Sequence, residues 1–186
     1  DGYLMDHPAN REAAEAALRA LPEGVRVILD VSPVIGIPDG LPPTTLISMS
    51  TSEAAILWRD ADRKAIDVRS WLPAEDAPIA MATLLRRDVV VRAGKDGAYF
   101  TRYTDSAKLS STYIPSLSVE AIDTNGAGDA HTGVLAASLA QGTSMERALV
   151  LANCAGALAS TTVGPATCPP RTQIKAAADA LAEQED

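Results

Sequence analysis

The sequence predicts an α/β layered domain built around a mostly parallel sheet. Runs of β-branched residues alternate along the chain with segments whose apolar residues recur at helical spacing. The runs 25–31, "VRVILDV", and 88–94, "DVVVRAG", have the continuous apolar pattern of strands that are buried on both faces. Strands that alternate with helices favour parallel pairing, because a crossover helix carries the chain back to the start of the next strand.

Each expected element rests on a local pattern. Residues 9–21, "ANREAAEAALRAL", are Ala-rich, have apolar residues at helical spacing and stop at the breaker Pro22-Glu23-Gly24. A strand is expected at 44–49, and a helix over 51–59 opens behind a Thr/Ser cap. The other expected elements are a short buried strand in 1–6, a Pro/Gly loop at 32–43, a helix at 73–87, a hairpin formed by 88–94, the turn 95–97 and 98–103, an edge strand at 111–117, and helices at 126–141, 144–162 and 171–184.

Composition limits the class of protein. The chain has 186 residues, of which 47% are hydrophobic, so it is long enough and apolar enough to form a globular domain. The formal charge is −8, which argues against partners bound through phosphate backbones or anionic lipid surfaces. We therefore expect no nucleic acid and no membrane as partners.

The two cysteines and the N-terminal residue also carry information. Cys154 and Cys168 match no zinc or disulfide spacing, which favours a reducing, cytoplasmic location. No apolar run approaches the roughly 18 residues that a membrane span requires. Because the sequence starts at Asp1 rather than Met, we expect it to begin inside a larger protein.

The stretch 123–133, "DTNGAGDAHTG", combines glycines, an acid and the start of an expected helix. A helix N-terminus presents unpaired N–H groups, and glycines let an anion approach them closely. Asp129, at the edge of such an anion hole, is placed to accept a proton from an attacking hydroxyl group. The alternative interpretation is an ordinary Gly-rich helix entry with Asp129 as a first-turn acid.

This stretch resembles the D-T-x-G-A-G-D signature of the ribokinase-like (PfkB-type) carbohydrate kinase family. The family usually has an aromatic residue where this chain has His131, which we read as neither catalytic nor metal-binding. The matching positions are Asp123, Thr124, Gly126, Ala127, Gly128 and Asp129.

A second resemblance lies in "SMSTSEA", residues 48–54, which is similar to the family's strand-to-helix N-x-x-E motif. Glu53 matches the acid, whereas Ser50 replaces the asparagine. In the family this motif organises Mg²⁺ and phosphate, mainly through water. Glu53 as a first-turn acid that completes a helix cap is the alternative.

Two further segments resemble the family's nucleotide site. In "VVVRAGKDGAYF", residues 89–100, Gly94 and Gly97 fit the phosphate turn, and Arg92 replaces a hydroxyl residue. Two interpretations of Arg92 stay open: it is a phosphate ligand, or it lies on the exposed side of the strand. The alternative interpretation of the two glycines is an ordinary hairpin turn. The segment 152–170 resembles the helix and loop that enclose adenine; its matching residues are Asn153, Ala159 and Gly164, and Asn153 as a satisfied helix-interface amide is the alternative.

The resemblance implies a ribokinase-like layered α-β-α fold, with residues 1–186 as the nucleotide-binding and catalytic part of a single kinase domain. It implies ATP-dependent phosphorylation of a hydroxyl group on a small-molecule sugar or nucleoside, with Mg²⁺ bridging the phosphates. Asp129 would be the base, and the N–H groups of Ala127, Gly128 and Asp129 would stabilise the transferring phosphoryl group. The N-terminal part with the Gly-Gly sugar motif and the lid has no counterpart in this sequence.

Asp123 and the carbonyl of Asn125 match positions that hold a monovalent cation, such as K⁺, in many members of this family. Cys168 stands where that loop often has a hydroxyl residue, and a thiol is a poor K⁺ ligand. Two alternatives to the kinase remain: a nucleotide-binding module or pseudo-kinase without strong turnover, which Ser50 and Arg92 favour, and a structural or assembly domain. A homodimer stays open.

Overall fold

The computed structural model describes residues 7–31, 37–38, 40–62, 73–105 and 108–183. They fall into two compact units: unit 1 contains Asp1–Arg92 and Tyr99–Thr112, and unit 2 contains Ala93–Ala98 and Tyr113–Asp186. The strand expected in 1–6 and part of the loop expected at 32–43 lie outside the described residues.

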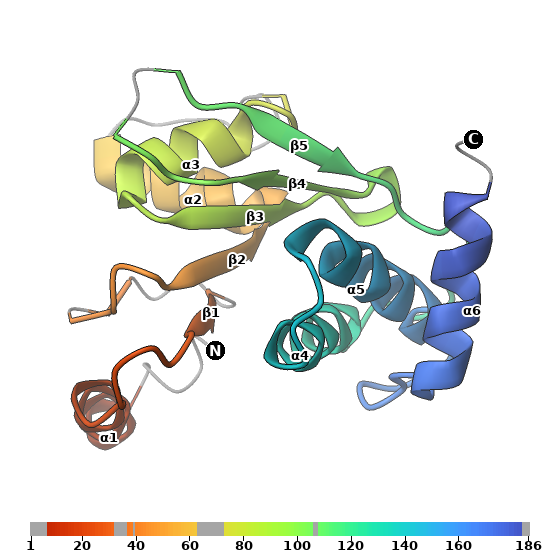
Figure 1. The fold of residues 1–186 in the computed structure, drawn as a ribbon, viewed down its shortest axis with the longest axis horizontal. Helices are drawn as coiled ribbons and strands as arrows, with labels where there is room; N and C mark the ends of the chain where they lie inside the picture. Colours follow the sequence, from red (N-terminus) through yellow and green to blue (C-terminus); the bar gives the residue numbers. More distant parts are fainter. Residues whose placement is uncertain (1–6, 32–36, 39, 63–72, 106–107, 184–186) are drawn as a thin grey trace. The chain divides into compact units, whose positions relative to one another are not determined.

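The described strands form one five-stranded sheet in the order β1-β2-β3-β4-β5 (Figure 1). The strand β1 pairs with β2, and β2 pairs with β3, both in parallel. A 3₁₀ turn (Gly94–Asp96) connects β3 to β4, and so short a connection forms a hairpin rather than a parallel crossover. The sheet is therefore mixed, with a parallel first part. Its strands are β1 (Ile28–Asp30), β2 (Leu46–Ser50), β3 (Asp88–Arg92), β4 (Ala98–Thr101) and β5 (Ser111–Ile114).

The described α-helices correspond to the segments expected from the sequence, with shifted ends. The helix expected at 73–87 starts later, because the amides of Asp76 and Ala77 both donate to the Pro73 carbonyl in a preceding turn. It stops where Arg86 adopts a left-handed conformation with φ 52°. The helices are α1 (Pro8–Arg19), α2 (Thr51–Asp62), α3 (Ala77–Leu85), α4 (Ala127–Ala140), α5 (Met145–Ala159) and α6 (Arg171–Ala182).

The core of unit 1 lies between one face of the sheet and the helices α2 and α3 (Figure 1). Alternate residues of β2 and β3 supply that face: Ile47, Met49, Val89 and Val91 are all fully buried. The residues between them, including the buried Ser48, therefore point to the opposite face of the sheet.

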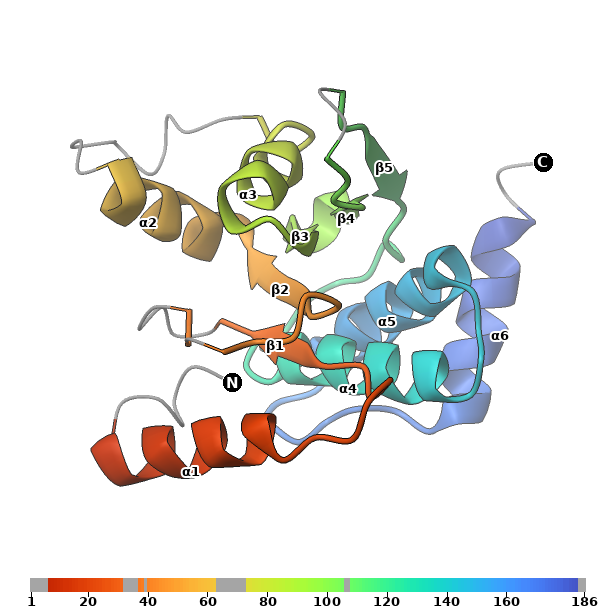
Figure 2. The ribbon, with the colours of Figure 1, turned by 60° about the vertical axis from the view of Figure 1, so that its left-hand side comes forward.

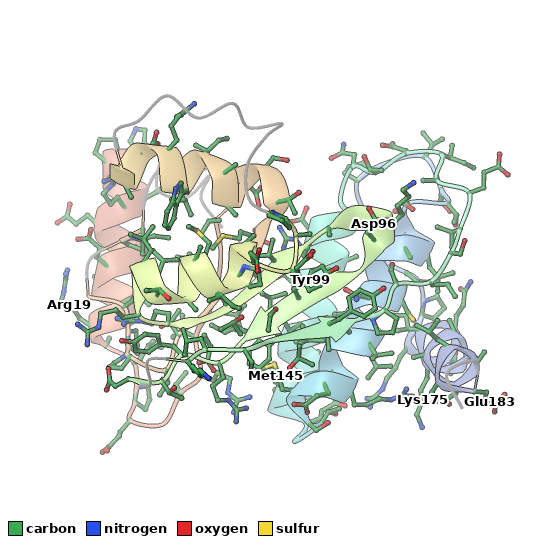
Figure 3. The ribbon with its side chains drawn as sticks, turned by 90° about the horizontal axis from the view of Figure 1, so that it is seen from above. Arg19, Asp96, Tyr99, Met145, Lys175 and Glu183 are labelled. Carbon is green, nitrogen blue, oxygen red and sulfur yellow. The ribbon has the colours of Figure 1, made fainter. Side chains whose placement is uncertain are left out.

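In unit 2, α5 packs against both α4 and α6 (Figure 2). The helix α6 buries Ile174 and Ala178. Lys175 on this helix and Glu183 directly after it are exposed (Figure 3). Ala-rich faces allow such close helix packing, because their side chains are small. Within the described part of the chain, no helix is long and apolar enough to cross a membrane.

Candidate functional site

The glycine turn of the D-T-x-G-A-G-D motif starts α4, as the sequence predicts. Gly126 is the N-cap residue, with φ 79°, and a Cβ atom there would lie 1.9 Å from the Pro165 carbonyl oxygen. Only glycine fits both the backbone angle and the space. No side chain caps α4, so the N–H groups of Gly128 and Asp129 at its first turn remain directed at the solvent end of the helix.

The anion hole has fewer free backbone N–H donors than the sequence predicts. The Ala127 N–H group donates to the Thr124 carbonyl at 3.2 Å and is used within the turn itself. The donors that remain are those of Gly128 and Asp129. The Asp129 side chain is exposed, and no described residue forms an ion pair with it. A carboxylate at the mouth of an uncapped helix N-terminus can accept a proton from a hydroxyl group that approaches an anion held there.

Asp123 ties the glycine turn to the loop that follows α5. One carboxylate oxygen accepts the Asn125 N–H at 3.0 Å, and the other accepts the Gly164 N–H at 2.9 Å. These two bonds, that from Asn125 first, hold the pKa of Asp123 below its usual value. The backbone adds to this tie, because the Asp123 N–H donates to the Ser160 carbonyl at 3.0 Å.

These hydrogen bonds limit how the Asp123 carboxylate could bind the predicted cation. Both carboxylate oxygens already accept backbone N–H groups, so a cation would have to share them. Cys168 is exposed and its thiol lies 3.8 Å from the Pro169 carbonyl. Among the described residues, no three His, Cys, Asp or Glu side chains come together as a metal-binding group. A K⁺ site at Asp123 and Asn125 therefore stays a prediction.

Gly156 is a site residue that sequence reasoning missed. A Cβ atom at this position of α5 would lie 3.0 Å from the Ala127 carbonyl oxygen, in the first turn of α4. The glycine allows α5 to approach the start of α4 more closely than a larger residue would. The sequence signal for this contact was a glycine within an Ala-rich helix. Glycine destabilises a helix relative to alanine, so its presence there indicates that a close backbone contact needs the space.

Two of the predicted nucleotide-binding residues, Gly97 in the turn after β3 and Asn153 in α5, lie against the same backbone carbonyl group. Gly97 has φ 87°, and a Cβ atom there would lie 2.4 Å from the Ile114 carbonyl oxygen. The buried Asn153 side chain donates to the same carbonyl at 3.1 Å and to the Pro115 carbonyl at 2.8 Å. Gly94, with φ 63°, has open space around it. The Asn153 amide group thus donates to two backbone carbonyls at the end of β5, which agrees with the alternative of a satisfied structural amide.

In unit 1, Ser50 and Glu53 form a reciprocal cap at the start of α2. The Ser50 hydroxyl oxygen accepts the Glu53 N–H at 3.2 Å, and a Glu53 carboxylate oxygen accepts the Ser50 N–H at 2.6 Å. This capping box satisfies two backbone donors at once. The serine that replaces the family's asparagine therefore has a structural use here, and Glu53 is the first-turn acid of the alternative interpretation.

Arg92 is partly buried and paired, which answers one question that the sequence left open. Its guanidinium donates to both carboxylate oxygens of Asp30, at 2.6 and 3.2 Å, and to the Ser48 hydroxyl at 2.8 Å. It also approaches a Glu53 carboxylate oxygen at 3.5 Å. Of the two interpretations that the sequence left open, an exposed Arg92 does not agree with this geometry, because the side chain pairs with Asp30 at the end of β1. A phosphate would have to compete with Asp30 for it.

The predicted site residues thus fall into two groups, each within one unit. Ser50, Glu53 and Arg92 come together in unit 1. The turn residues, Asp123 and Asn153 belong to unit 2, where one set of bonds links the glycine turn to the loop after α5 and another links α5 to the hairpin turn.

Comparison with known proteins gives consistent matches. A family model described as pfkB family carbohydrate kinase matches residues 1–172. The aminoimidazole riboside kinase of Salmonella typhimurium is 30% identical over 177 residues, which are 90% of this chain and 52% of that protein. An uncharacterised sugar kinase of Escherichia coli is 32% identical over 175 residues, or 88% of this chain and 47% of that protein.

Solved structures share the fold. A ribokinase from Thermotoga maritima superposes with a TM-score of 0.70 at 24% identity, covering 89% of this chain and 52% of that one. A ribokinase from Cryptococcus neoformans in complex with ADP also gives 0.70, at 16% identity, covering 89% of this chain and 56% of that one. The chain therefore has the ribokinase fold, and it spans about half the length of the curated relatives above.

Proposed function

Because this chain belongs to the pfkB family of carbohydrate kinases, we propose that it carries the nucleotide-binding and catalytic part of an ATP-dependent kinase that phosphorylates a hydroxyl group of a sugar or nucleoside. The observation that carries the proposal is the first turn of α4. It has two free backbone donors, no side-chain cap and an exposed acid at its mouth, in the sequence order of the family motif.

In this proposal Asp129 is the general base. Its carboxylate takes the proton of the acceptor hydroxyl as that oxygen attacks the terminal phosphoryl group. The N–H groups of Gly128 and Asp129 stabilise the charge on the transferring group, while Ala127 contributes through the turn, where its N–H is bound to Thr124. ATP supplies the phosphoryl group, and Mg²⁺ on its phosphates reduces their charge.

The remaining predicted residues have supporting parts in the proposal. At the turn after β3, Gly94 offers backbone to a phosphate or sugar group, because the space where its side chain would lie is open. Asn153 holds the end of β5 beside Gly97, so its contribution to nucleotide binding is indirect. The ADP in the Cryptococcus neoformans ribokinase, which shares this fold, supports an adenine nucleotide as the phosphate donor.

The test is a steady-state kinase assay of the full-length protein against a panel of sugars and nucleosides. Asp129→Asn should leave the fold and ATP affinity nearly unchanged and lower turnover by roughly 10²–10⁴-fold, the range for loss of general acid–base catalysis. Glu146→Gln is the matched control, since Glu146 is also an exposed first-turn acid but lies on α5, which Ser144 caps. It should leave turnover unchanged.

Two outcomes would contradict the proposal. Near-normal turnover of the Asp129→Asn protein would remove Asp129 from the role of base. Binding of ATP without transfer to any acceptor in the panel would instead favour the nucleotide-binding module that the sequence left as an alternative.

A further inference from the structure

Charged side chains converge in unit 1 where three parallel strands end. Asp30 is the last residue of β1, Arg92 is the last of β3, and Glu53 lies in the first turn after β2. The strand register pairs Asp30 with Ser48 and Arg92 with Ser50, so the strand side chains share one face of the sheet. Their exposed fractions are only 9% for Asp30, 13% for Arg92 and 15% for Glu53. Charges so little exposed must be paired.

Arg92 provides the pairing for both acids. Its planar guanidinium meets the Asp30 carboxylate with two parallel N–H donors, a geometry that a lysine cannot reproduce. The second terminal nitrogen also lies 3.5 Å from Oε2 of Glu53. That same oxygen accepts the Ser50 N–H of the capping box, so two donors fix Glu53 through one oxygen.

Asp30, Ser48, Glu53 and Arg92 form one corner of unit 1, and without the guanidinium two carboxylates and the Ser48 hydroxyl would face the position that it leaves. Hard oxygen ligands of this kind are what Mg²⁺ and Mn²⁺ prefer. Two acids and one guanidinium leave a formal charge of −1, against −2 for the acids alone. The arginine therefore occupies the place, and supplies the positive charge, that a divalent cation would otherwise provide.

We propose that Arg92 is the built-in cation of this corner: it neutralises Asp30, positions the Glu53 carboxylate, and keeps divalent metal ions from binding there in the absence of nucleotide. The consequence for catalysis rests on the proposed function. In a kinase of this kind, Mg²⁺ would reach the reaction only on the nucleotide, and Glu53 would meet it with a carboxylate that Arg92 already holds.

The first test is Mn²⁺ binding to the full-length protein without nucleotide, measured by electron paramagnetic resonance of the free ion. The wild type should bind no Mn²⁺ at this corner, so its titration and that of Glu53→Gln should coincide up to millimolar Mn²⁺. Tight Mn²⁺ binding by the wild type that is lost in Glu53→Gln would overturn the proposal.

The second test removes the guanidinium. Arg92→Met should lower Tm, because it removes the positive charge beside two buried carboxylates, and should gain a Mn²⁺ site. Added Mn²⁺ should then raise Tm by several degrees, as binding to the native state alone requires. The double variant Arg92→Met/Glu53→Gln should bind Mn²⁺ at least tenfold more weakly than Arg92→Met.

Two control variants distinguish the loss of the positive charge at residue 92 from a general loss of stability. Arg86→Met removes an arginine whose pairing with Asp105 is on the surface, and it should neither gain a Mn²⁺ site nor lose much stability. Arg92→Lys keeps a positive charge and should still exclude Mn²⁺, although it loses the two-pronged contact.

A folded Arg92→Met protein that gains no Mn²⁺ site would overturn the proposal, and if this variant does not fold, the Mn²⁺ titrations of the wild type and Glu53→Gln decide it. None of these readouts needs turnover. Failure to find a phosphate acceptor would therefore count against the proposed function and leave the role of Arg92 to be decided by Mn²⁺ binding.

Discussion

Gly97 and Asn153 meet at one carbonyl group, that of Ile114. The glycine leaves room for this oxygen, since a Cβ atom at residue 97 would lie 2.4 Å from it, and the asparagine amide donates to it at 3.1 Å. The turn after β3, the end of β5 and the helix α5 are thereby fixed to one another within unit 2. Nucleotide binding at this turn would depend on all three.

The two glycines of the hairpin turn should respond differently to alanine. A Cβ atom at residue 94 would meet no atom within 4 Å. Gly94→Ala should therefore lower the unfolding free energy only by the strain of a left-handed backbone, about 1–2 kcal/mol. Gly97→Ala adds a collision with backbone and should cost more, with a lower yield of folded protein. Urea unfolding of the two variants measures the difference, and equal costs would mean that the Ile114 carbonyl can move aside.

Asn153→Asp should separate a structural role from base recognition. The change keeps the size of the side chain but replaces the donors to Ile114 and Pro115 with a buried carboxylate, and we expect a loss of at least about 1–3 kcal/mol in unfolding free energy. Asn10→Asp, the same change at an exposed position of α1, is the control and should be nearly neutral. Unchanged stability with weakened ATP binding would show instead that Asn153 reads the base.

The stability that Asp123 provides by holding the loop after α5 should depend on pH. Since the folded state lowers this pKa, the stabilisation is present above the unfolded value of about 3.9 and is lost as pH falls through the lower folded value. Asp123→Asn should therefore have a lower Tm than wild type at pH 7, and the gap should narrow below about pH 4. A gap that stays constant down to pH 3 would contradict the ionised carboxylate as the cause.

The two cysteines should differ sharply in reactivity. Burial raises the pKa of the Cys154 thiol to about 11, so at pH 8 only about one molecule in a thousand carries the thiolate there. Cys168 is exposed. In a thiol titration of the native protein, Cys168→Ser should remove one reactive equivalent and Cys154→Ala none, until denaturant is added. Fast native reaction of Cys154 would show that α5 and α6 separate readily.

Local patterns predicted much of the fold. Helical periodicity and caps located α1, α2, α4, α5 and α6 to within a few residues, and β-branched runs located β2 and β3. The ends were less certain: Val25 was expected in a strand, but its N–H donates to the Pro22 carbonyl in a turn, and β1 begins at Ile28. Such ends depend on single hydrogen bonds that the periodicity of a sequence does not contain.

The sequence by itself determined the chemistry at the start of α4, because the positive φ of Gly126, the uncapped N–H groups and the first-turn acid are local features of D-T-x-G-A-G-D. Only the tertiary structure decided the partners. Arg92 finds Asp30, 62 positions away, Asn153 finds Ile114, and Gly156 admits the carbonyl of Ala127. These contacts join distant segments, so they exist only after the strands have taken their register and the helices have packed.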